Sequence, residues 1–293
     1  MECSIRDIPG FGRVLWMTDG CTEAAAALEY GIRVVHLSCA GMENLFYCQP
    51  EDLSDGLYTE QGWRIRGGHR LWLAPESEKS YHPDNEPVAW SREEDGVLLT
   101  QTPDPELGVR KSVRLTFAEG GGLQVEHRME NVSQHAVEGA LWAVSTVDGG
   151  GTASVAFGGP EPGGYSPRRL VSLWGDTCLH DGRLQFFRDR LTARHLPLDP
   201  YCKLGLYSRE GRAVLENKGQ RLELTFGAEP MERYPDCGCN FELYLDRNVM
   251  ELETLGTMCR LEPGQQAAHL ERWRVTPCPD GRAAPASGAA APG

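Results

Sequence analysis

Two glutamates in the segment 240–255 have the chemistry and the spacing for acid–base work. Apolar and polar residues alternate through this segment, NFELYLDRNVMELETL, which predicts two strands joined by a turn at Arg247–Asn248. Antiparallel pairing about that turn sets Glu242 opposite Glu253, on the face away from the apolar side chains. Opposed carboxylates repel one another unless a cation or ligand hydroxyl groups separate them. The pair is therefore either a site that takes a proton from a substrate hydroxyl or grips sugar hydroxyls, or two side chains that face solvent.

A second group of reactive or binding side chains follows a double glycine, in the stretch RGGHRLWLAPE at 66–76. The two glycines allow a tight or left-handed backbone, which would project His69, Arg70 and Trp72 from one rigid corner. Guanidinium, imidazole and a flat indole suit the recognition of sugar hydroxyls and ring faces. The alternative is a polar turn with a core tryptophan and a surface pair between arginine and Glu76.

Two further histidines fall on predicted strands. His127 shares a strand face with apolar residues, so it points toward whatever that face covers. It is either a hydrogen-bonded core residue or, with an ordinary pKa near ~6.5, an acid or base at neutral pH. His269 alternates with Glu271 and Trp273, and we expect it to be structural.

The elements that must position these residues are strands. Alternating runs separated by Gly, Pro, Asp and Asn, without a series of βαβ units, predict an all-β sandwich of large antiparallel sheets. The clearest hairpin joins 113–117 to 123–129 through the glycine run at 119–122. The best helical candidate is 22–30, whose EAAAALE core has high helix propensity, although it could also be a surface segment before the first strand. Further strands are predicted at 31–37, 96–100, 139–147, 184–187, 202–207, 213–216, 222–226, 241–245, 250–255 and 269–275.

Length and composition predict one globular domain over 1–276 and a disordered Pro/Ala/Gly tail over 277–293. The net charge of −13, with no basic run, argues against a nucleic-acid partner. No stretch matches a secretory signal or a span of roughly 18 apolar residues, so we expect no membrane partner and a cytoplasmic location. The sequence leaves the oligomeric state open.

The ten cysteines are expected to be reduced thiols in a chain of this kind. Cys237 and Cys239 are spaced too closely for a usual pair of zinc ligands, and we expect no metal. Phosphate-binding glycine loops, Gly-x-Ser-x-Gly elbows and His-Glu-x-x-His helices do not occur in the sequence.

Several motifs, taken in order, resemble the galactose-mutarotase-like, or aldose 1-epimerase, superfamily, and within it a poorly characterised bacterial branch. Matches in the correct order are more specific than any one motif. The resemblance extends from about Gly31 to Val275 and comprises GIRVVHLSCAGMENLF, GGHRLWLAPE, YHPDNEPV, VEHRMEN, LWAV with DGGG, YPDCGCNFELY, MELETLG, LEPG and HLERW.

This resemblance implies a β-supersandwich that binds a small-molecule carbohydrate on a broad concave sheet, with no cofactor. In characterised members a glutamate on a late strand acts as the base on the anomeric hydroxyl and a histidine protonates the ring oxygen. ELET is similar to the motif of that glutamate, which carries the role of base to Glu253. IRGG is similar to a segment of the hexose-6-phosphate epimerase branch whose arginine contacts the substrate, so Arg66 and Arg70 are candidates for that contact.

The chain departs from the family where mutarotases carry their acid, in an Asn-His-x-Tyr-Phe-like segment, because LWAV places Trp142 in that region. Either His69 or His127 supplies the proton, or the protein binds or senses a sugar without turning it over. A positioned acid contributes about 10²–10⁴-fold in rate. A third option is another carbohydrate reaction, such as lyase chemistry on uronic acids. The expected catalytic residues are Glu253, His69 and His127, and the expected substrate-binding residues are Arg66, Arg70, Trp72, Trp142, Asp236, Asn240 and Glu242.

Overall fold

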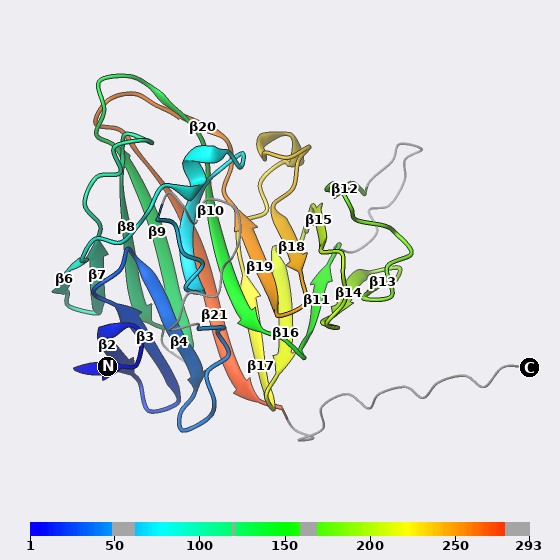
Figure 1. Ribbon diagram of the computed structural model, residues 1–293, viewed down its shortest axis with the longest axis horizontal. Helices are drawn as coiled ribbons and strands as arrows, with labels where there is room; N and C mark the ends of the chain where they lie inside the picture. Colours follow the sequence, from blue (N-terminus) through cyan, green and yellow to red (C-terminus); the bar gives the residue numbers. More distant parts are fainter. Residues whose placement is uncertain (49–61, 119–120, 159–168, 279–293) are drawn as a thin grey trace, which may run out of the picture.

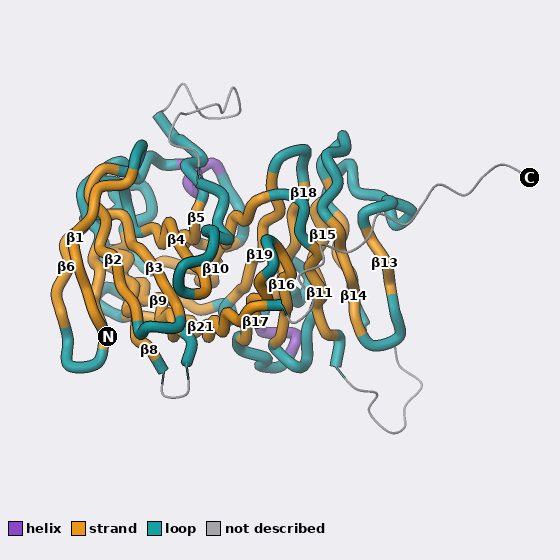
Figure 2. Tube along the Cα trace, turned by 90° about the horizontal axis from the view of Figure 1, so that it is seen from below, coloured by secondary structure: helices purple, strands orange, loops and turns teal. Residues whose placement is uncertain are grey.

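The chain folds into two stacked antiparallel sheets, seen in a computed structural model that describes residues 1–48, 62–118, 121–158 and 169–278 (Figure 1). Figure 2 shows the two layers, with β5 and β10 of one sheet lying above β9 and β21 of the other. The predicted all-β sandwich is confirmed. Helical structure in the described residues is confined to two short 3-10 turns, η2 (Glu78–Tyr81) and η3 (Met231–Arg233).

The larger sheet has 11 strands. In spatial order they are β1 (Glu2–Ile8), β2 (Gly12–Thr18), β3 (Thr22–Ala27), β4 (Arg33–Cys39), β5 (Gly68–Ala74), β10 (Val137–Asp148), β19 (Val249–Leu255), β18 (Phe241–Leu245), β15 (Cys202–Leu206) and β12 (Val171–Leu173), with β20 (Cys259–Leu261) paired to β10.

The smaller sheet has 10 strands. In spatial order they are β13 (Leu184–Phe186), β14 (Arg190–Arg194), β11 (Thr152–Ala156), β16 (Arg212–Asn217), β17 (Gln220–Thr225), β21 (Gln266–Pro277), β9 (Leu123–Asn131), β8 (Val109–Phe117), β7 (Gly96–Thr100) and β6 (Ala89–Arg92).

The main core lies between the sheets and contains the inward side chains of both. Strand β9 alternates strictly between buried and half-buried residues, because only one of its faces packs on this core. The central strands β5, β10, β15 and β19 are instead buried along nearly their whole length. A second apolar cluster covers their outer face, the one turned away from the smaller sheet; it consists of Trp63, Trp72, Ala74, Ala140, Trp142, Val144, Tyr234 and Leu255.

The helix considered at 22–30 is wrong, because residues 22–27 form strand β3. This strand pairs with β2 and β4, and the four alanines 24–27 are completely buried. Helix propensity is a weak preference that ladder hydrogen bonds and burial override. Alanine side chains are small enough to fit on both faces of a closely packed strand.

The other strands predicted from alternation are present, with small differences at their ends. Several strands were not predicted, among them β1 and β2 at the start of the chain. Strand β1 lies at the edge of the larger sheet and is mostly exposed, so its sequence carries no regular apolar face. The predicted tail overlaps the end of β21 at Pro277, and its residues from 279 onward lie outside the described part of the chain.

Among the described residues, no helix is both long and apolar enough to cross a bilayer. All ten cysteines fall within those residues, and none of them is joined in a disulfide.

Candidate functional site

The hairpin of β18 and β19 has the predicted register: Glu242 lies opposite Glu253. The turn that fixes this register is closed by Asp246, whose Oδ1 accepts hydrogen bonds from the backbone N–H groups of Asn248 and Val249 at 2.7 and 2.8 Å. Both glutamates belong to the outer face of the larger sheet, and they are only 2% and 1% exposed. The solvent-facing alternative for the pair is therefore wrong.

Neighbouring strands place further side chains beside the two glutamates on this outer face. Residues that pair across adjacent strands lie side by side on one face of a sheet. The row that contains the glutamates reads Arg70, Val144, Glu253, Glu242 and Gly205 across β5, β10, β19, β18 and β15, and the next row reads Gly68, Thr146, Glu251, Tyr244 and Lys203.

Lys203 is the cation that separates the opposed carboxylates. Its Nζ lies 3.3 Å from Glu242 Oε2, 3.3 Å from Glu253 Oε2 and 3.6 Å from Glu76 Oε2. The ammonium group also lies 4.6 Å from the ring centre of Trp142. Burial lowers the pKa of Lys203, but its carboxylate neighbours outweigh burial and raise that pKa above its usual value. The amine is therefore a fixed positive charge.

Trp142 holds Glu253 from the adjacent strand. Its Nε1 donates a hydrogen bond to Glu253 Oε2 at 2.8 Å, the same oxygen that Lys203 contacts. The other oxygen, Oε1, is buried and has no hydrogen-bond partner among the described residues. Burial and the charges of Glu251 and Glu76 raise the pKa of Glu253 above its ordinary value, against the effects of Lys203 and the Trp142 hydrogen bond. Trp142, which stands where the resemblance led us to look for a histidine, thus orients the carboxylate of Glu253.

Glu242 is the carboxyl group that protonates more readily. Burial, the charge of Glu253 and the nearby carboxyl of Asp236 raise the pKa of Glu242 well above its ordinary value of 4.5, against the effect of Lys203. Asp236 comes from a tight loop in which three successive residues, 236–238, have left-handed φ angles of 52°, 66° and 96°. Two of them are not glycine, so the loop holds an unfavourable backbone conformation directly beside the carboxyl pair.

A cavity of about 380 Å³ opens over this part of the sheet, which is within the range of about 300–1,000 Å³ typical of small-molecule sites. Its polar lining residues include Arg70, Lys203, Glu76, Asp246 and Glu251. Its walls are strongly aromatic, and the aromatic residues are Trp63, Trp72, Tyr81, Trp142, Trp174, Tyr201 and Tyr244.

Arg70 is fixed at the edge of this cavity. Its guanidinium group lies 4.3 Å from the ring centre of Trp72, donates a hydrogen bond to Thr146 Oγ1 at 3.1 Å and contacts Glu251 Oε1 at 3.3 Å. The cavity lining thus contains Arg70, Trp72 and Trp142, three of the residues expected to bind substrate. Lys203 was not predicted as a site residue. The signal that could have revealed it is its position as the one charged residue in the otherwise apolar strand CKLGL.

The corner at 66–68 is left-handed as the double glycine predicted, with φ angles of 45°, 77° and 73°. A Cβ atom on Gly67 would lie 2.0 Å from the backbone oxygen of Tyr47, so only glycine fits there. Arg66 extends away from the cavity: it lies over the ring of Tyr30 and donates a hydrogen bond to Asn85 Oδ1 at 2.9 Å.

His69 and His127 are not brought together with Glu253. Adjacent residues of a strand point to opposite faces, so Arg70 lies on the outer face and His69 lies in the core between the sheets. There its Nε2 is 3.1 Å from Nε2 of His127. Burial lowers the pKa of His69 to about 3, which leaves the ring neutral at physiological pH. Neither histidine therefore lies where it could protonate a sugar bound beside Glu253.

Asn240 is also directed away from a substrate. Its Oδ1 accepts a hydrogen bond from the Ser208 backbone N–H at 2.7 Å, and its Nδ2 donates to the backbone oxygens of Ser208 and Gly227 at 2.9 and 3.0 Å. The side chain is completely buried. Asn240 therefore joins the loop segments that contain Ser208 and Gly227, directly before the start of β18.

Replacing Asn240 by alanine is expected to lower the free energy of unfolding by about 1–3 kcal/mol for each buried backbone group that loses its partner. Urea unfolding measures this loss. The control is Asn248→Ala, a substitution of the same kind in the exposed hairpin turn, for which we expect a change within about 0.5 kcal/mol. Equal effects of the two substitutions would contradict this role of Asn240.

Sequence comparison gives no relative: no family model matches the chain, and no curated protein matches it. Solved structures do match. A TPR-domain containing protein from Parabacteroides distasonis superposes with a TM-score of 0.61 at 15% identity over 90% of this chain, which spans only 47% of that protein's chain.

Two further matches cover nearly the whole of both chains. The protein Slr1438 from Synechocystis has a TM-score of 0.57 at 14% identity, over 89% of this chain and 94% of its own. A galactose mutarotase-like protein from Clostridium acetobutylicum has a TM-score of 0.56 at 10% identity, over 94% of this chain and 98% of its own. At these identities the likeness shows the fold alone, and that fold is the galactose-mutarotase-like β-sandwich.

Proposed function

We propose that the protein binds the pyranose form of a neutral sugar in the cavity and interconverts its anomers by acid–base catalysis at Glu253 and Glu242. The observation that carries this proposal is the opposed, buried pair of carboxyl groups, in contact with two cavity-lining residues, Lys203 and Trp142. Aromatic walls suit the apolar face of a pyranose ring, and sugar hydroxyls can take the place of the ammonium group between the carboxyl groups.

The two carboxyl groups differ in a way that assigns their roles. Burial raises the pKa of Glu253, but the Trp142 hydrogen bond to Oε2 favours its ionised form, and Oε1 has no hydrogen-bond partner among the described residues and can act as base. Glu242 lies near both Glu253 and Asp236, which favours its protonated form. Paired groups with diverging proton affinities are typical of acid–base sites.

In the reaction that follows, Glu253 takes the proton of the anomeric hydroxyl and the bond between C1 and the ring oxygen breaks. Glu242 gives its proton to that ring oxygen, so the sugar becomes the open-chain aldehyde. After rotation about the C1–C2 bond, the ring oxygen attacks the other face of the aldehyde, and both protons return to where they started. No electrons are transferred to or from the protein, and the carboxyl groups end in their initial states.

The charge around the cavity favours a neutral sugar over a phosphorylated or acidic one. The two cations already contact carboxylates, Arg70 with Glu251 and Lys203 with the opposed pair. A phosphate or uronate would bring a further negative charge into this environment. Carboxyl groups outnumber cations among the described residues of the cavity and its opposed pair: Glu76, Asp246, Glu251, Glu242 and Glu253 against Arg70 and Lys203.

A second candidate is a protein that binds the same sugars without chemistry. It is favoured by the burial of the two carboxyl groups, which are 1–2% exposed behind Lys203 and Trp142. In that case Lys203 stays between the two carboxyl groups, and the sugar contacts only the aromatic walls and the charged residues that line the cavity. Sugar would then bind without any exchange of its anomers.

One experiment separates the two functions. Tryptophan fluorescence is titrated with a panel of aldoses, their 6-phosphates and a hexuronate, while exchange between anomers is followed by NMR on the same samples. We expect saturable quenching and faster exchange for a neutral aldose, and weaker binding of its charged analogues. Quenching without faster exchange would support the binding protein, and the absence of both effects across the panel would contradict both functions.

A further inference from the structure

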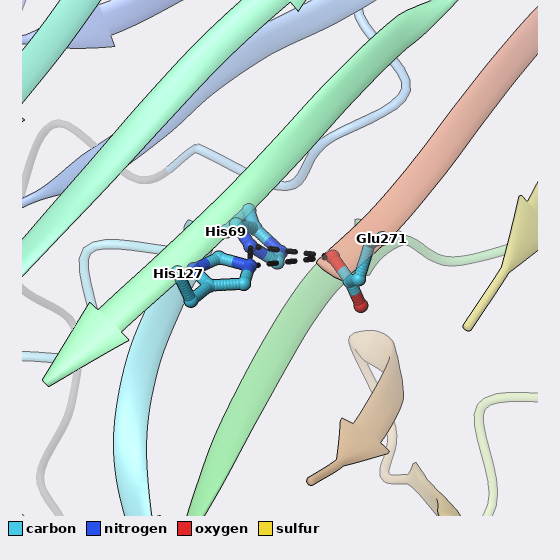
Figure 3. A group of neighbouring side chains, drawn as sticks. All are labelled: His69, His127 and Glu271. Carbon is cyan, nitrogen blue, oxygen red and sulfur yellow. Dashed lines mark hydrogen bonds and ion pairs between the residues drawn. The ribbon is translucent and has the colours of Figure 1, made fainter. Parts of the chain in front are cut away.

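Three side chains from both sheets meet in the main core, on the side of β5 opposite to the cavity. They are His69 of β5, His127 of β9 and Glu271 of β21, and Figure 3 shows them pointing toward one point between the strands. Nε2 of His69 lies 3.1 Å from Nε2 of His127, and Glu271 Oε2 lies 3.6 and 3.5 Å from these two nitrogens. All three residues are at most 2% exposed.

The two separations to Glu271 fit ligands of one ion better than hydrogen bonds, and the 3.1 Å contact between the histidines suits either arrangement. A hydrogen bond from a histidine to a carboxylate is typically about 2.7–2.9 Å long, well below the 3.5 and 3.6 Å found to Glu271. Two donors that each lie about 2.0–2.1 Å from a tetrahedral zinc ion are about 3.3–3.4 Å apart. The three edges of the triangle, from 3.1 to 3.6 Å, bracket that separation.

Contacts behind two of the three donors, those of His69 and Glu271, orient them as outer groups orient metal ligands. The Nδ1 atom of His69 lies 2.8 Å from Ser145 Oγ, which fixes the ring so that Nε2 faces the other two donors. Glu271 Oε1 accepts a hydrogen bond from Thr254, and Oε2 accepts one from Trp273 Nε1 at 3.0 Å.

Hydrogen bonds on both sides fix the position of Thr254. Its hydroxyl group donates its one proton to Glu271, and Thr254 Oγ1 therefore accepts a hydrogen bond from Nε2 of His269 at 2.7 Å. His269 thereby has the structural role that its alternation predicted. Glu271 is left with a second lone pair on Oε2, directed at the two histidines.

The negative charge of the buried Glu271 carboxylate also favours a cation in this cluster. The ion-pair partners of Glu271 among the described residues are these two histidines, and its side chain is 1% exposed. A carboxylate buried without a cation is costly, and the usual remedies are a charged partner or a metal ion. The two hydrogen bonds to Glu271 reduce this cost without supplying a positive charge.

We propose that His69, His127 and Glu271 bind a divalent transition metal ion, for which zinc is the best match, between the two sheets. Two imidazole nitrogens and one carboxylate oxygen are a usual donor set for zinc, with a fourth position left for water. The ion would join the larger sheet, through β5, to the smaller sheet, through β9 and β21. No local sequence pattern reveals this site, because its three ligands come from strands far apart in the chain.

The test uses the full chain, unfolded in the presence of a chelator and refolded with or without zinc. We expect about one zinc ion to remain bound per chain after dialysis, and a thermal unfolding midpoint that rises with free zinc concentration. With cobalt(II) in place of zinc, we expect the visible absorption of a tetrahedral site without a thiolate charge-transfer band. Absence of binding, or a thiolate band from the exposed cysteines, would overturn the proposal.

Matched variants then locate the ion. His127→Asn and Glu271→Gln are expected to weaken zinc binding by more than about tenfold, whereas His195→Asn should not change it. His195 is a suitable control because it is also buried and its ring accepts a hydrogen bond from the Gly150 backbone. Unchanged binding in both ligand variants would contradict the assignment, and the cobalt spectrum of the unsubstituted chain decides the question even if a variant does not fold.

Discussion

The Glu253→Gln variant is expected to exchange sugar anomers about 10²–10⁴-fold more slowly than the unsubstituted protein, while its affinity for the sugar changes little. Glutamine keeps the size of the side chain and an oxygen that can accept the Trp142 hydrogen bond, but it cannot take the anomeric proton. Exchange measured by NMR at saturating sugar isolates the catalytic step from binding, which tryptophan quenching reports separately.

The matched control for this variant is Glu126→Gln, on β9 of the other sheet, where the glutamate pairs with Arg128 and has no contact with the cavity. We expect its exchange rate and its affinity to match those of the unsubstituted protein. If Glu253→Gln kept full exchange activity, Glu253 would not be the base. If the unsubstituted protein bound sugar but had no activity to lose, the second candidate function would hold.

The Lys203→Met variant is expected to lose about 3–5 kcal/mol of unfolding free energy at neutral pH. Methionine fills a similar volume but leaves the buried carboxyl groups of Glu242 and Glu253 facing one another without a cation. Urea unfolding gives the loss directly, and sugar binding need not be known to interpret it.

The loss in Lys203→Met should depend on pH, in a direction fixed by the raised pKa values of the two glutamates. A carboxyl whose pKa is higher in the folded than in the unfolded protein contributes stability below its ordinary value of 4.5, and this contribution is lost as pH rises through the folded value. Because Lys203 lowers both folded pKa values, its removal raises them further. The difference between variant and unsubstituted protein should therefore widen above pH 4.5, as pH rises from the folded pKa values of the unsubstituted protein toward the higher values of the variant.

Lys111→Met provides the control for this pH dependence. Lys111 is also buried, but its ion-pair contact among the described residues is a single carboxylate, Asp104, at 3.9 Å. We expect a smaller loss with a weaker dependence on pH over the same range. A loss in Lys203→Met that was constant with pH would mean that the lysine acts through packing rather than through charge.

The fold could be predicted from the sequence because apolar and polar residues alternate along many of its strands, as in β9 and in the hairpin of β18 and β19. Where packing does not follow that pattern, prediction failed. The alanines of β3 are buried on both faces of the strand and show no alternation of apolar and polar residues. Their high helix propensity therefore favoured the prediction of a helix. Strand β1 is mostly exposed and has no apolar face to detect.

Within the site, the pairing of residues across one hairpin could be predicted, but contacts between residues of strands far apart in the sequence could not. The turn at Arg247–Asn248 was enough to place Glu242 opposite Glu253. Lys203 lies two strands from Glu253, and its role depends on the order of strands in the sheet, which no local pattern encodes. The placement of His69 could have been predicted, since it precedes Arg70 directly and a strand turns adjacent residues to opposite faces.

Strand β5 presents Arg70 and Trp72 to the cavity and His69 to the core, so one short segment serves two compartments at once. Loss or gain of a single residue within it would send the arginine into the core and the histidine into the cavity. Insertion or deletion of a residue within β5 is therefore not tolerated. Among descendants of this chain, the strand should change by substitution alone and keep its length.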